Sequence, residues 1–184
     1  GNAGGTNVGR VLGWKYGILV ILLDALKGIV AVVFVARLFY LDSMPFSNQT
    51  PFDDFTLVQI IAGLSAVLGH IWTIFANFKG GKGIATALGM LLIISTVDIL
   101  IAFGVFVIVV ALSRYVSLGS ISAAVAVPIT LYVREHLFNA NISNYYTLFP
   151  FVIALSLLVI FTHRKNISKL LKGRENKISF SKKK

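Results

Sequence analysis

Long apolar runs separated by short polar stretches make up most of the chain. The runs that predict helices cover Gly17–Tyr40, Leu57–Phe75, Ile84–Leu112, Val116–Val133 and Tyr145–Phe161. A helix needs about 20 apolar residues to cross the hydrocarbon core of a bilayer. The pattern therefore predicts an all-α, polytopic bundle of membrane helices.

The run Ile84–Leu112 is too long for one ordinary crossing. Its 29 residues would extend roughly 43 Å as one helix, against a hydrocarbon core of ~30 Å. Its polar break is Ser95-Thr96-Val97-Asp98, whose side chains can cap a new helix. We therefore predict that this run forms two short helices, with the chain turning back at the break. This gives about six membrane segments in this chain. It also puts Asp98 and Ser168 on opposite sides of the membrane.

Composition supports a membrane protein. Of the 184 residues, 57% are hydrophobic and 13% are charged, whereas soluble domains carry about 25% charged residues. The mean hydropathy is +0.84. The chain contains no cysteine, which excludes a thiol nucleophile, a disulfide framework and a cysteine metal site.

The net charge of +10 is concentrated at the C-terminal end. Residues 164–184 contain nine basic residues and one acid, Glu175. Such a tail beside a membrane helix favours anionic lipid headgroups rather than nucleic acid. We expect a single membrane-embedded domain over residues 1–184, with residues 164–184 as a basic cytoplasmic tail. The acidic stretch 42–55 lacks Lys and Arg, so we expect it on the outer side.

The segment Phe78–Gly83, here called the lysine loop, combines two lysines with three glycines. Glycine lets backbone N–H groups approach a ligand closely, and the apolar run from Ile84 predicts that a helix begins directly after the loop. Lysine and a helix N-terminus both favour a phosphate or carboxylate. The spacing is not that of a P-loop. The alternative is a basic cytoplasmic turn with no ligand.

Other polar groups lie inside or beside the apolar runs. Asp24 and Lys27 share a helix face, which favours a structural ion pair over direct chemistry. His70 lies within about two helical turns of the lysine loop, so it is either a packing residue or a contributor to that site. The segment 1–15 is a second candidate phosphate loop or an ordinary interfacial loop, in which Thr6 or Asn7 would cap a short helix ending near Leu12.

These stretches together resemble the bacterial acyl-phosphate-dependent glycerol-3-phosphate acyltransferases, the PlsY family. The first matching stretch is Gly1-Asn2-Ala3-Gly4-Gly5-Thr6-Asn7. The second is Gly69-His70 followed by Phe78–Thr86, and the third is His163–Ile167 with Gly173–Lys177. Asp24-x-x-Lys27-Gly28 and Ser117–Ile121 are similar too. The resemblance covers essentially the whole chain.

Three positions depart from the family pattern. Gly5 replaces an alanine, Thr73 stands where a proline is usual, and the family's serine would directly precede Gly1. We expect that serine, and the family's first membrane helix, to precede Gly1 in a longer chain. With that helix, the full family fold would have seven membrane segments.

The resemblance implies transfer of a fatty acyl group from acyl phosphate to the 1-hydroxyl of glycerol 3-phosphate. The products are lysophosphatidic acid, which begins phospholipid synthesis, and phosphate. It implies a multi-pass protein of the bacterial inner membrane with its active-site loops on the cytoplasmic face. No cofactor, metal or nucleic acid is implied; the partners are the two substrates and membrane lipids. Acyl-CoA enzymes carry His-x-x-x-x-Asp, and none of the three histidines of this chain has that spacing.

Roles follow from the resemblance residue by residue. His163, Asn166 and Lys82 are the expected catalytic residues, with His163 and Asn166 orienting the hydroxyl and stabilising charge at the carbonyl oxygen. The proton acceptor is left open between histidine and the substrate's own phosphate. His136, on the predicted outer side, is excluded. The expected substrate- and phosphate-binding residues are Asn2, Thr6, Asn7, Arg10, His70, Lys79, Gly80, Gly81 and Gly83.

Two other functions remain open from the residues alone. A small anion or phosphate transporter would also use basic glycine-rich loops, but its polar groups should gather near the membrane midplane. A non-catalytic membrane subunit is the second alternative. Production of lysolipid from acyl phosphate and glycerol 3-phosphate separates both from the enzyme.

Overall fold

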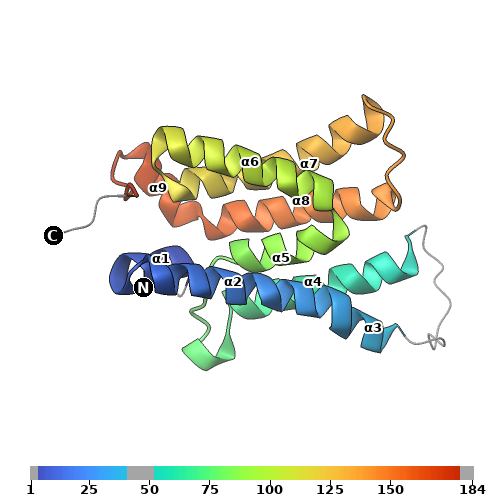
Figure 1. Ribbon diagram of the computed structural model, residues 1–184, viewed down its shortest axis with the longest axis horizontal. Coiled ribbons are helices and arrows are strands. Elements are labelled where there is room, and N and C mark those ends of the chain that lie inside the picture. Colours follow the sequence, from blue (N-terminus) through green and yellow to red (C-terminus); the bar gives the residue numbers. More distant parts are fainter. Residues whose placement is uncertain (1–3, 41–51, 179–184) are drawn as a thin grey trace. The chain divides into compact units, whose positions relative to one another are not determined.

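A computed structural model describes residues 4–40 and 52–178, and these residues form helices and no strand (Figure 1). The elements are α1 (Gly5–Leu12), α2 (Trp14–Val30), the π-helix η1 (Ala31–Val35), α3 (Ala36–Phe39), α4 (Asp54–Ile71), the 3₁₀ turn η2 (Ile74–Ala76), α5 (Ile84–Ile94), α6 (Thr96–Ser113), α7 (Val116–His136), α8 (Tyr145–Thr162) and α9 (Arg164–Leu171). Asn2 and most of the acidic stretch 42–55 lie outside the described residues.

The predicted membrane segments are present. Five helical stretches in the described part are long and apolar enough to cross a membrane: Trp14–Phe39, Asp54–Ala76, Thr96–Ser113, Val116–His136 and Tyr145–Thr162. Ile84–Ile94 is a further apolar helix, but with 11 residues it is shorter than these five. The all-α membrane fold class is confirmed.

Several helix ends differ from the predicted ones. The first long helix begins at Trp14 rather than Gly17, directly after Gly13, whose φ of 97° interrupts the preceding helix. The second begins at Asp54 rather than Leu57 because the Asp53 side chain accepts a hydrogen bond from Thr56 N over 2.8 Å. This N-cap satisfies a donor that the helix itself leaves unpaired. The prediction took the first apolar residue as the start and missed the cap.

The break predicted inside Ile84–Leu112 lies at Ser95, which has φ −145° and ψ 58° between α5 and α6. Thr96, the first residue of α6, turns its hydroxyl back to Leu92 O over 2.8 Å. The helix therefore ends where the run of apolar side chains is interrupted by hydroxyl groups that bond to the backbone.

The chain divides into two compact units. Unit 1 comprises Gly1–Thr96 with Ile142–Phe151, and unit 2 comprises Val97–Asn141 with Val152–Lys184. In unit 1, small residues let α2 and α5 approach closely. A Cβ on Gly28 would collide with Thr86 O, and a Cβ on Gly89 would collide with Ala25 O. Close packing through small residues is typical of membrane helices.

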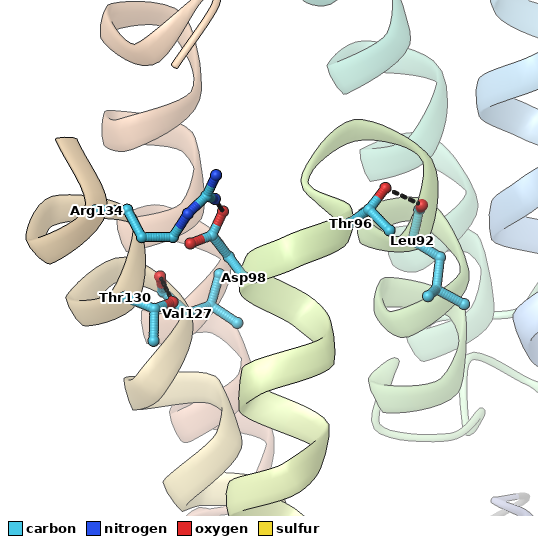
Figure 2. Close-up of polar contacts among 6 residues, drawn as sticks. All are labelled: Leu92, Thr96, Asp98, Val127, Thr130 and Arg134. Carbon is cyan, nitrogen blue, oxygen red and sulfur yellow. Dashed lines mark hydrogen bonds and ion pairs between the residues drawn. The ribbon is translucent and has the colours of Figure 1, made fainter. Parts of the chain in front are cut away.

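A buried ion pair joins α6 and α7 within unit 2 (Figure 2). Arg134 Nη1 donates to Asp98 Oδ2 over 2.6 Å, and the Asp98 side chain is only 1% exposed. Asp98 lies near the start of α6, and Arg134 lies near the end of α7. The two helices are therefore fixed to each other at this end by opposite charges that water screens little.

Candidate functional site

The lysine loop is anchored to the end of α4 in unit 1. Gly80 N donates to Ile71 O and Gly81 N donates to His70 O, each over 3.1 Å. The last carbonyls of a helix have no partner within it, so these two bonds complete the C-terminus of α4. The N–H groups of Gly80 and Gly81, expected to hold an anion, are instead engaged within the protein. Their part in the loop is therefore to fix its position.

The loop leads directly into α5, as predicted. Gly83 has φ 80° and ψ 0° and precedes Ile84, the first residue of the helix. A positive φ of this size favours glycine, because a Cβ would crowd the backbone. Lys82, half-buried, comes directly before this turn, whereas Lys79 is exposed. A half-buried lysine directly before the N-terminus of α5 makes an environment that favours an anion.

His70 lies beneath the loop and contacts an acid from another helix. Asp24 Oδ1 is 3.3 Å from His70 Nδ1 and accepts a hydrogen bond from Lys27 Nζ over 2.8 Å. The Asp24 and His70 side chains are 6% and 9% exposed, whereas that of Lys27 is 58% exposed. The expected Asp24–Lys27 ion pair is present. Its histidine partner could not be read from the sequence, where the two residues are far apart.

The segment around Thr6 and Asn7 is helical, not a loop. Both residues lie in the first turn of α1, and the N-cap is Gly4, whose carbonyl accepts from Asn7 N and Val8 N. The prediction that Thr6 or Asn7 caps this helix is wrong, because the helix begins one residue before Thr6. Arg10 is exposed in the last turn. Figure 1 shows α1 and the lysine loop at the same end of unit 1.

His163 lies at the junction of α8 and α9 in unit 2. It is 1% exposed, and Nδ1 lies 2.8 Å from Val159 O one helical turn earlier. A carbonyl only accepts hydrogen bonds, so Nδ1 carries the proton and Nε2 holds the lone pair of the neutral ring. The backbone therefore selects the tautomer in which Nε2 can accept a proton.

Asn166, in the first turn of α9, is held by an acid that follows that helix. Its Nδ2 donates to Glu175 Oε1 over 3.0 Å. The chain reverses at Gly173, where Gly173 N donates to Leu170 O and Arg174 N to Lys169 O. This is a common helix C-terminus. It returns Glu175 to Asn166, the residue three positions after His163.

The segment after Glu175 brings further polar groups to the same end of unit 2. Ile178 N donates to Arg114 O over 2.8 Å, and Lys177 Nζ lies 5.5 Å from the ring centroid of Tyr115. α7 and α9 are in contact. Arg114 is not among the site residues expected from the sequence.

Ser117, in the first turn of α7, is a second residue that is not among the expected site residues. Its hydroxyl is buried and has no hydrogen-bond partner among the described residues. A buried hydroxyl without a partner is costly. Its position at a helix N-terminus is the signal that could have selected it. His136 lies at the other end of α7, about 28 Å away along a helix that rises ~1.5 Å per residue.

Comparison with known proteins covers nearly the whole chain. The model of the family described as glycerol-3-phosphate acyltransferase matches residues 1–173. Glycerol-3-phosphate acyltransferases of Chlorobium chlorochromatii (strain CaD3) and Chlorobaculum tepidum are 43% and 42% identical to this chain. These matches cover 99% and 100% of this chain and 84% of each relative.

Two solved structures are also similar. They are crystal structures of PlsY (YgiH), an integral membrane glycerol 3-phosphate acyltransferase, in the glycerol 3-phosphate form and the lysophosphatidic acid form. Both are 37% identical to this chain, with TM-scores of 0.78 and 0.77, and both cover 97% of it; the matches cover 79% and 81% of the solved chains. The family and the enzyme class predicted from the three motifs are confirmed: this chain belongs to the glycerol-3-phosphate acyltransferase family of integral membrane acyltransferases.

Proposed function

We propose that this chain transfers a fatty acyl group from acyl phosphate to the 1-hydroxyl of glycerol 3-phosphate. The hydroxyl oxygen bonds to the acyl carbon, the bond from that carbon to the phosphate oxygen breaks, and lysophosphatidic acid and inorganic phosphate leave. Family membership supports this reaction, as do the glycerol 3-phosphate and lysophosphatidic acid forms of the similar solved protein. An acyl phosphate carries a good leaving group, so no acyl-enzyme is needed.

Unit 1 supplies the phosphate-binding groups in this proposal. Lys82 and the first-turn N–H groups of α5, after Gly83, hold a phosphate. Lys79 and Arg10, both exposed, add positive charge that attracts it. Thr6 and Asn7 donate hydrogen bonds to the phosphate from the first turn of α1. Asn2, which precedes α1 in the sequence, has the same role. Gly80, Gly81 and His70 support the loop.

Unit 2 supplies the groups that handle the attacking hydroxyl. His163 Nε2 accepts the hydroxyl proton, since Nδ1 is already committed to Val159 O. Asn166 has one amide hydrogen on Glu175, which leaves Oδ1 to orient the hydroxyl and a second amide hydrogen for the carbonyl oxygen. Ser117 adds a donor for a phosphate oxygen at the N-terminus of α7.

The observation that carries this assignment is the geometry of His163. A buried imidazole with Nδ1 fixed by a backbone carbonyl is suited to accept a proton at Nε2. We place its end of unit 2, together with the lysine loop, on the cytoplasmic face of the bacterial inner membrane, because basic residues favour that side.

The test is a turnover assay with the purified protein in lipid vesicles. Acyl phosphate and labelled glycerol 3-phosphate should yield labelled lysophosphatidic acid and one phosphate per lysolipid, and acyl-CoA in place of acyl phosphate should yield neither. Uptake of label into the vesicles without lysolipid would overturn the proposal in favour of transport. Turnover with acyl-CoA alone would overturn the choice of donor.

A further inference from the structure

We propose that Asp24 is a positioning residue that holds the lysine loop in its binding conformation by fixing the His70 imidazole. This inference rests on the proposed function for what the loop binds. Asp24 is in α2, and His70 is in the last turn of α4. Neither residue is part of the lysine loop, so the effect of Asp24 on an anion passes through His70.

The first contact orients the imidazole ring. Asp24 Oδ1 lies 3.3 Å from His70 Nδ1, with both side chains less than 10% exposed. An ionised carboxylate only accepts hydrogen bonds, so Nδ1 carries a proton toward it. In a buried setting such a contact holds the ring strongly, because water offers no alternative partner.

The opposite edge of the ring supports the loop. A Cβ on Gly81 would collide with His70 Nε2 and Cε1. The imidazole therefore fills the space directly beneath the Gly81 backbone and leaves no room for a side chain there. The ring is held between Asp24 on one edge and Gly81 on the other.

The backbone of His70 supports the same residue. His70 O accepts from Gly81 N, and Ile71 O accepts from Gly80 N, each over 3.1 Å. A turn of the ring would press on Gly81 and strain these bonds, since ring and carbonyl belong to one residue. Lys82 follows Gly81 directly, so a shift of Gly81 also moves the half-buried Lys82.

The ion pair with Lys27 does not account for the arrangement. The Lys27 side chain is 58% exposed, and exposed ion pairs contribute little to stability. A buried carboxylate is costly to desolvate, so a second buried partner argues for a role beyond that pair. The alternative, in which Asp24 serves only the pair, predicts that loss of Lys27 and loss of Asp24 have the same consequence.

The test compares three variants of the full chain. Asp24→Leu keeps the branched shape of the side chain and removes the acceptor. Asp24→Asn keeps an acceptor for His70 Nδ1 but loses the charge that pairs with Lys27. Lys27→Met removes only the ammonium and is the matched control. Loss of a hydrogen bond to a charged group corresponds to a change of roughly 10- to 100-fold in an equilibrium constant.

We expect Asp24→Leu to raise the KM of at least one phosphorylated substrate about tenfold or more, with a smaller change in kcat. Asp24→Asn and Lys27→Met should each change the KM values by less than about threefold. If Asp24→Leu acts through His70, adding it to His70→Ala should change kcat/KM by less than about twofold beyond His70→Ala alone. If the losses in kcat/KM from Asp24→Leu and His70→Ala multiply in the double variant, the proposal is overturned. Equal losses in Lys27→Met and Asp24→Leu would also overturn it.

A second measurement needs no turnover. Hydrogen exchange of a peptide covering residues 79–83 should be faster in Asp24→Leu than in the unmodified chain or in Lys27→Met. If the unmodified chain forms no lysolipid, the proposed function fails, while this exchange still decides the role of Asp24. Unchanged exchange would overturn it. Should Asp24→Leu not fold, His70→Ala tests the same path, since loss of the ring between Asp24 and Gly81 should also speed exchange of residues 79–83. Unchanged exchange in His70→Ala would overturn the proposal.

Discussion

Asn166 and Glu175 are joined by a hydrogen bond of 3.0 Å between Nδ2 and Oε1, across the turn that ends α9. Glu175 is buried, although it follows a helix that is basic and largely exposed. A carboxylate only accepts, so the contact fixes which side of the Asn166 amide faces Glu175. The Asn166 oxygen is thereby turned away from the acid.

This contact leads to the first prediction, on the polar end of unit 2. His163→Ala and Asn166→Ala should each lower kcat by about 10²-fold, because a positioned proton acceptor contributes at least that much and so does a donor to the charge that develops on the carbonyl oxygen. Steady-state turnover at saturating substrate measures this. His136→Ala is the matched control and should retain near-normal kcat, since His136 lies at the other end of α7. Equal losses in all three variants would show that the site is misassigned.

The second prediction concerns the acid itself. Glu175→Ala should lower kcat about as much as Asn166→Ala, and Asn166→Asp should be no better, because it would bring a second carboxylate against Glu175. Turnover of each purified variant, with its thermal unfolding as a check on folding, is the measurement. A fully active Glu175→Ala protein would mean that the contact does not orient Asn166.

The third prediction separates the two lysines of the loop. Lys82→Met should lower turnover by about 10²-fold or more while the protein still inserts, since removing one donor that stabilises charge in the transition state typically costs that much. Lys79→Met should cost less, because Lys79 is exposed and Lys82 is half-buried. The comparison is made in kcat/KM at equal protein in the membrane. Near-normal activity of Lys82→Met would contradict a phosphate-binding loop.

The fourth prediction concerns stability through Asp98 and Arg134. Arg134→Met leaves a buried carboxylate without its charged partner, so it should lower the free energy of unfolding by about 3–5 kcal/mol. The double variant Asp98→Leu with Arg134→Met should recover most of that loss. Thermal unfolding in detergent is the measurement. If the double variant is as unstable as the single one, the charges themselves are not the cause.

The fifth prediction tests the membrane topology. Basic residues favour the cytoplasmic side, and this rule puts the junction of α5 and α6 opposite the basic α9. Asp98, the natural choice from sequence, is buried in an ion pair, so exposed positions are better labelling sites. Thr96→Cys and Ser168→Cys, in a chain without natural cysteine, should react with an impermeant thiol reagent from opposite sides. Reaction from the same side would exclude the hairpin.

Local patterns in the sequence were enough to predict a helix break, a helix start and the family. The break at Ser95 and the start of α5 at Ile84 were both predicted, because hydroxyl and glycine residues act on the backbone within one turn. The family followed from ordered motifs that the comparisons confirm. The starts of α2 and α4 were misjudged by three residues, since apolar content does not reveal where a cap or a glycine ends a helix.

Only the tertiary structure decided the partners of the buried polar groups. Asp24 with His70 and Asp98 with Arg134 join residues separated by dozens of positions. A sequence shows that a charge inside an apolar run needs a partner, because burial of an unpaired charge is costly. It does not show which one, because that choice depends on which helix faces pack together. The lysine loop was recognisable from its residues, but the hydrogen bonds from Gly80 N and Gly81 N to the end of α4 could be found only in the folded chain.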